Sequence, residues 1–141
     1  MTNQPIATRS DVRFVTTGAY QAGVCNIGPA EIRRRRMAGH VGLAGTLALL
    51  SLLVAVGAPP VARLLVVAPA AIAASGYIQA RSRFCANYGW RGIFNVGDVG
   101  DAASVEDTAA RAADQRRARQ IGMQSLGTGL VAGIAAMLIP V

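Results

Sequence analysis

Apart from four methionines, the only soft metal ligands in this sequence are Cys25, Cys85 and His40. The two cysteines lie far apart in polar segments, and their spacing fits neither a disulfide framework nor a zinc knuckle. We therefore expect two free thiols and no metal or other cofactor. The alternative is a membrane-bound redox- or metal-responsive protein that uses Cys25 and Cys85 on its cytoplasmic face.

The sequence has few of the residue combinations that carry out catalysis. It has one histidine, no Ser/His/Asp arrangement and no pair of carboxylates in an apolar stretch. The glycine-rich run after Phe84 matches neither a P-loop nor a GxGxxG fingerprint. These observations predict a non-enzymatic protein.

Arginine is the strongest charge signal, with 14 basic residues that are all arginine, 7 acidic residues and a net charge of +7. Four consecutive arginines point all round a helix at about 100° per residue, so they cannot face a single partner. Anionic lipid headgroups are the natural partner, whereas nucleic-acid binding needs a broad basic surface with base-reading side chains and is not expected. The predicted headgroup contacts are Arg33, Arg34, Arg35, Arg36, Arg81, Arg83, Arg116, Arg117 and Arg119.

The elements that position these residues are three hydrophobic blocks. The sequence is 52% hydrophobic and only 15% charged, which favours a membrane protein. We expect an all-α integral membrane fold. Three spans are predicted. Residues 29–57 form a juxtamembrane helix that continues into the first transmembrane helix. The second transmembrane helix is 60–82, with a kink at Pro69, and the third is 121–139.

Three further segments complete the predicted organisation. Residues 1–28 form a cytoplasmic N-terminal segment, 83–103 an interfacial segment rich in glycine and aromatic residues, and 104–120 a charged cytoplasmic helix. Ser104 is expected to cap that last helix, as in a capping box. Arg63, at the start of the second span, is expected to extend outward along the lipid.

The arginines also predict the orientation. They flank each block on one side, and only Arg63 falls on the other. By the positive-inside rule this indicates a multi-pass protein of the bacterial plasma membrane, with a cytoplasmic N-terminus and the C-terminus outside.

Aromatic and small residues refine this arrangement. Rings of the kind that favour the headgroup region gather near the inner end of the second span: Tyr77, Phe84, Tyr88, Trp90 and Phe94. Residues small enough for close helix packing recur at four-residue spacing: Ser125, Gly129 and Gly133 in the third block, Ala70 and Ala74 in the second. This packing occurs either within one chain or between copies.

The segments CNIGPAEIRRRRMAGHVG and RSRFCANYGWRGIFNVGDVG resemble those of a group of small bacterial multi-span membrane proteins that carry a CNIGPAEI-type juxtamembrane motif. The resemblance covers about residues 24 to 100. It implies an integral membrane location and carries over no activity.

Taken together, these features predict a small non-enzymatic integral membrane protein. It would be a structural, accessory or assembly component that packs as a homo-oligomer or within a larger membrane complex, with its arginine-rich face on anionic lipid. Besides the redox or metal alternative, a third hypothesis is a lipid-handling or transport accessory whose kinked second span is its moving part.

Overall fold

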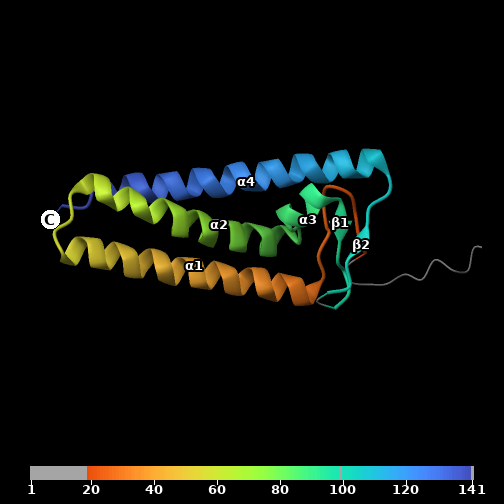
Figure 1. Cartoon of the computed structure of the whole chain (residues 1–141), viewed down its shortest axis with the longest axis horizontal. Helices are drawn as coiled ribbons and strands as arrows, with labels where there is room; N and C mark the ends of the chain where they lie inside the picture. Colours follow the sequence, from red (N-terminus) through yellow and green to blue (C-terminus); the bar gives the residue numbers. More distant parts are fainter. Residues whose placement is uncertain (1–18, 99, 141) are drawn as a thin grey trace, which may run out of the picture.

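The computed structural model describes residues 19–98 and 100–140, and within them the chain is mostly helical. In chain order the elements are α1 (Pro29–Ala55), the 3-10 helix η1 (Pro60–Val66), α2 (Val67–Ser82), α3 (Ala86–Arg91), β1 (Ile93–Phe94), β2 (Ala103–Ser104) and α4 (Thr108–Met137). Figure 1 shows α2 lying between α1 and α4, with α3 and both strands gathered at one end of the bundle. We call this end the head; it comprises residues 19–28, 83–98 and 100–107.

The first helix begins and ends where its local sequence predicts. Gly28 is the N-cap, Pro29 occupies the first helical position, and Glu31 lies in the first turn, near the positive end of the helix dipole. The helix ends at Ala55, and Gly57 turns the chain with a positive φ of 66°. The connector to η1 is therefore short, and α2 returns beside α1 (Figure 1).

The second span changes helix geometry at a different place from the predicted kink. Residues Pro60–Val66 form a 3-10 helix, and the α-helix begins at Val67. Pro69 consequently falls in the first turn of α2, where a backbone N–H has no partner within the helix and its loss costs little. The expected mid-helix kink at Pro69 is thus replaced by a 3-10 to α junction just before it.

The charged segment and the third hydrophobic block form one continuous helix, α4. Its N-cap is Asp107, whose carboxylate accepts a hydrogen bond of 2.7 Å from the Ala110 backbone N–H. The prediction that Ser104 caps a helix over 104–120 is wrong, because Ser104 pairs with Ile93 in the antiparallel β1–β2 ladder. This two-stranded ladder and two isolated β-bridges, Gln21 with Cys25 and Ile27 with Asn95, are the departures from an all-α fold in the described residues.

Two helical stretches are long and apolar enough to cross a membrane: α1 and the continuous 23-residue stretch Pro60–Ser82. The C-terminal half of α4 is less apolar, because glycines and the polar side chains of Gln124, Ser125 and Thr128 interrupt it. This half of α4 nevertheless packs along α2, as α1 does on the other side of α2 (Figure 1).

Glycines allow α1 and α2 to approach each other closely. A Cβ atom on Gly42 would lie 2.6 Å from the backbone nitrogen of Ala73, and one on Gly76 would collide with the backbone of Gly39. Gly39 in turn lies under the ring of Tyr77. The contacts at Gly42 and Gly76 leave no room for any side chain, so these two positions require glycine.

The predicted small-residue face of α4 makes the corresponding contact with α2. A Cβ atom on Gly129 would lie 2.7 Å from the carbonyl oxygen of Val67, and one on Gly133 would collide with the Val67 side chain. Ser125 is buried on the same face, and Ala70 and Ala74 are buried on α2. The structure therefore places this packing within one chain.

The close contact at Gly129 can be tested against a matched glycine. Gly129→Ala should lower the free energy of unfolding by about 1–3 kcal/mol, because the added methyl group overpacks the α2–α4 contact. Gly127→Ala, on the same helix with open space around it, should leave stability unchanged or raise it by up to about 1 kcal/mol. Unfolding of the detergent-solubilised protein measures both. Equal losses in the two variants would contradict the described packing.

Candidate functional site

The arginines predicted to contact headgroups gather at the head end of the bundle. They lie at the start of α1, at the end of α2 and in the first half of α4, which meet there (Figure 1). Seven of these nine side chains are exposed, and Arg35 and Arg117 are partly buried. We call these nine residues the arginine collar: Arg33, Arg34, Arg35, Arg36, Arg81, Arg83, Arg116, Arg117 and Arg119.

One buried carboxylate organises part of this collar. The Glu31 side chain is fully buried, and its oxygens lie 3.7 Å from Arg34 Nη1 and 3.6 Å from Arg35 Nη2. The Tyr88 hydroxyl donates a hydrogen bond to Glu31 Oε1 at 3.4 Å, and the Arg35 guanidinium lies over the Tyr88 ring. Burial, followed by the Glu31 charge, raises the pKa of Tyr88. These contacts hold the first turn of α1 against α3.

A second buried carboxylate, Asp114 of α4, holds the segment that precedes α1. Its Oδ2 accepts a hydrogen bond from the Tyr20 hydroxyl at 3.0 Å, and its Oδ1 accepts one from the Gly23 backbone N–H at 2.7 Å. Burial and the hydrogen bond to Asp114 raise the pKa of Tyr20 to about 12. The Tyr20 ring also stacks on Phe94, with ring centroids 4.6 Å apart.

The buried Asn26 side chain connects the same segment to the end of α2. Asn26 Nδ2 donates to the Cys85 carbonyl at 3.1 Å, and the Cys85 backbone N–H donates to Asn26 Oδ1 at 2.6 Å. The Asn26 and Ile27 backbone N–H groups both donate to the carbonyl of Arg83, the only described residue other than glycine with a positive φ. Asparagine suits this position because its amide both donates and accepts.

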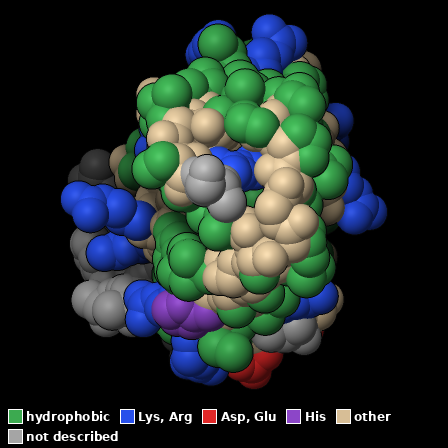
Figure 2. Space-filling view, turned by 90° about the vertical axis from the view of Figure 1, so that its left-hand side faces the viewer, with side chains coloured by type: hydrophobic (Ala, Val, Ile, Leu, Met, Phe, Trp, Pro, Cys, Tyr) green, Lys and Arg blue, Asp and Glu red, His purple; other side chains and the backbone are tan. Residues whose placement is uncertain are grey.

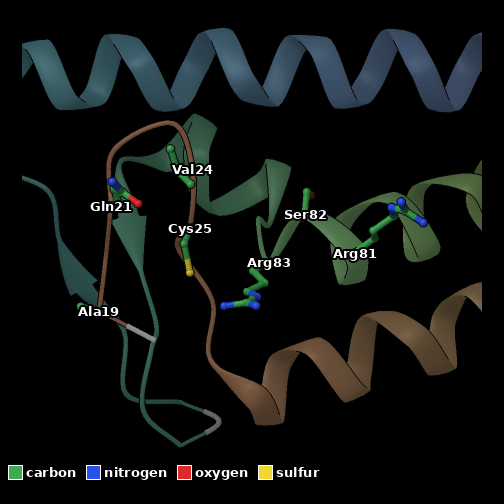
Figure 3. A pocket seen from close by; sticks show the side chains of 7 residues that line it. All are labelled: Ala19, Gln21, Val24, Cys25, Arg81, Ser82 and Arg83. Carbon is green, nitrogen blue, oxygen red and sulfur yellow. The ribbon is translucent and has the colours of Figure 1, made fainter. Parts of the chain in front are cut away.

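The two thiols are free and buried, and they differ in surroundings. Cys85 is fully enclosed, whereas Cys25 is 9% exposed and borders a pocket of about 240 Å³. Figure 3 shows the Cys25 sulfur and the Arg83 guanidinium turned toward the same opening, with Arg81 farther along α2. Among the described residues, no three His, Cys, Asp or Glu side chains lie close enough to bind a metal ion together.

The aromatic side chains do not form a single interfacial belt. Phe84, expected at the membrane interface, is fully buried and packs on Ala118 and Ile121, because the turn after α2 directs it under α4. Trp90 is half exposed beneath the Arg119 guanidinium, and Tyr88 and Phe94 make the head contacts described above.

Tyr77 lies between the head and the apolar part of the bundle. Its hydroxyl is 2.7 Å from His40 Nδ1, and the two rings meet edge to face. His40 is exposed on α1. The pair marks the level at which polar side chains give way to apolar ones.

Arg63 lies inside the opposite end of the bundle and does not extend outward. Its side chain is 1% exposed, and Nη1 donates to the carbonyls of Ala136 at 3.2 Å and Ile139 at 2.5 Å. The guanidinium thereby adds hydrogen bonds to carbonyls at and just after the end of α4, at the negative end of its dipole. Figure 2 shows this end of the molecule, where hydrophobic side chains surround a small basic patch.

Sequence reasoning missed Asn26, Asp114 and the cap by Arg63. Each is a polar residue whose partner lies in a distant part of the chain. For Arg63 the available signal was a single charge among apolar residues, which indicates a residue with a buried partner as readily as a solvated one. Asn26 and Asp114 carried no comparable signal in the sequence.

Comparisons of the chain with protein-family models, with curated proteins and with solved structures find no match. The resemblance to small bacterial membrane proteins therefore stays a prediction, and the function must be inferred from the geometry.

The contact between Tyr20 and Asp114 predicts a pH dependence. The pKa of Tyr20 rises from 10.0 to about 12 on folding, so the folded state holds this proton more tightly than the unfolded state. The contribution to stability is complete below pH 10 and is lost as the pH rises toward 12. We expect the free energy of unfolding to fall across this interval, and to fall less steeply in Tyr20→Phe. Identical slopes in the two proteins would show that the hydroxyl contributes nothing.

Proposed function

We propose that this protein is a small non-enzymatic integral membrane component whose three helices all span the bilayer and whose arginine collar lies on the anionic surface of the cytoplasmic leaflet. The observation that supports this proposal best is the distribution of side chains in the bundle. Most buried positions of the bundle hold small residues such as Gly42, Ala73 and Gly129, whereas most of the large apolar side chains are exposed. A water-soluble bundle has the reverse arrangement.

The outward faces of all three helices support this proposal. Only 11% of the most apolar stretch of α1 is buried, although this helix has some of the highest hydropathy in the chain. Val41 on α1, Leu65 on η1 and Val131 on α4 are each more than 60% exposed. Such a surface is costly in water and favourable in lipid.

The span of α4 is supported by its partners. Its Gly129 and Gly133 pack on the apolar part of α2, and its last turn is capped by Arg63 of η1. Its polar Ser125 and Thr128 hydroxyls donate to carbonyls one turn earlier, which suits a low-dielectric surrounding. The helix is therefore compatible with lipid despite its lower hydropathy.

The same packing limits which surfaces are available for association with other proteins. Because the glycine faces are used within the chain, a second copy or a larger membrane complex must meet the outward apolar faces or the head. The proposed role is structural or accessory, and the proposed location is the bacterial inner membrane with the N-terminus cytoplasmic.

Cysteine labelling tests whether the stretch Pro60–Ser82 crosses the membrane in the proposed direction. Ala58→Cys lies in the connector between α1 and η1, and Ala102→Cys is exposed in the head. A membrane-impermeant maleimide should label Ala58→Cys in intact cells, and Ala102→Cys only after the cells are opened. The wild type, whose two thiols are buried, reports the background.

Labelling of both variants from the same side would contradict three spans. Release of the wild-type protein from membranes by alkaline carbonate would contradict an integral location.

A further inference from the structure

An open groove runs along α2, between α1 and α4. Both outer helices pack on α2 but make almost no direct contact with each other, so a strip of α2 stays uncovered (Figure 1). The groove has a volume of about 260 Å³. Each helix contributes to its lining, which includes Leu43 and Thr46, Ala70 and Ala74, and Thr128 and Ala132.

The polar side chains of the lining already have partners within the chain, and the Tyr77 hydroxyl meets His40. Thr46 Oγ1 donates to the Gly42 carbonyl at 2.8 Å, and Thr128 Oγ1 donates to the Gln124 carbonyl at 2.9 Å. Both hydroxyl protons are thus used within their own helices, and alanines form the floor. An occupant of this groove is therefore apolar along its length.

At the head end the groove meets positive charge. Tyr77 lines both the groove and an adjoining hollow of about 420 Å³, which is otherwise formed by Arg36, Ala80 and Arg81. Both arginines are exposed, and neither makes an ion pair with a residue that the structure describes. An occupant that is apolar along the groove and anionic at its head end complements this surface.

The combined length of the groove and the adjoining hollow also fits one class of molecule. Their lining residues on α1 run from Arg36 to Thr46, a stretch that rises about 15 Å. That is half of a hydrocarbon core of about 30 Å, which is the depth that the acyl chains of one leaflet span.

We propose that this groove binds one anionic phospholipid, with an acyl chain along the alanine floor of α2 and the phosphate between Arg36 and Arg81. This inference rests on the proposed function, since it requires the groove to lie in the leaflet beside the arginine collar. It adds one defined site to a collar that otherwise contacts many headgroups.

Native mass spectrometry of the purified full-length protein can measure this binding. In titrations, phosphatidylglycerol should bind as one saturable copy at concentrations where phosphatidylcholine and glycerol phosphate do not. Phosphatidylcholine lacks the net negative charge, and glycerol phosphate lacks the acyl chains. Equal binding of phosphatidylcholine, or binding of glycerol phosphate alone, would overturn the site as described.

Two pairs of variants locate the lipid. Arg81→Gln should weaken phosphatidylglycerol binding about fivefold, as expected for one basic residue at a headgroup. Arg116→Gln, which removes the same charge from an exposed collar residue outside the groove lining, should change it less than twofold. Thr128→Phe, which fills the groove, should abolish the tightly bound copy, whereas Leu130→Phe on the same helix should retain it.

Equal weakening by Arg81→Gln and Arg116→Gln would show diffuse attraction to the collar and overturn the site. All four substitutions replace exposed side chains, so unfolding without lipid should match the wild type. If the protein resists carbonate extraction but fails these tests, the proposed function stands and only the lipid site is refuted.

Discussion

The arrangement of the whole bundle depends on the close approach of helix backbones at glycine. Gly76 on α2 meets the backbone of Gly39 on α1, and Gly129 on α4 meets the backbone of Val67 on α2. These contacts set the separation and rotation of the helices, because no side chain fits between them. In lipid there is little hydrophobic drive between helices, so such packing and the hydrogen bonds it allows carry the association.

The two outer helices use opposite sides of α2, and this has a consequence for the exposed apolar surface. With α2 in the middle, the three helices form a layer in which α1 and α4 do not close on each other. Large apolar side chains can then face outward on both outer helices, and the groove over α2 remains. A closed three-helix bundle of the same composition would have no such groove.

The head is held by buried polar contacts as well as by the apolar packing of Phe84 and Phe94. Asn26, Glu31 and Asp114 are all fully buried, and each connects parts of the chain that are distant in sequence. Losing any of these contacts would leave a buried polar group without a partner, which is costly. The head therefore fixes the ends of α1, α2 and α4 together, and the collar arginines share one side of the molecule.

The sequence alone determined the properties that depend on local chemistry. Pro29, Gly57 and the double proline set the bounds of α1, and the arginine flanks set which ends lie together. The first two apolar blocks gave the two stretches that are long and apolar enough to cross a membrane. Only the tertiary structure decided that Phe84 and Arg63 turn inward, that Ser104 belongs to a strand, and that the glycine faces meet within one chain. A helix that is apolar on every side has no periodic pattern to show which face packs, so its rotation follows from contacts with distant residues.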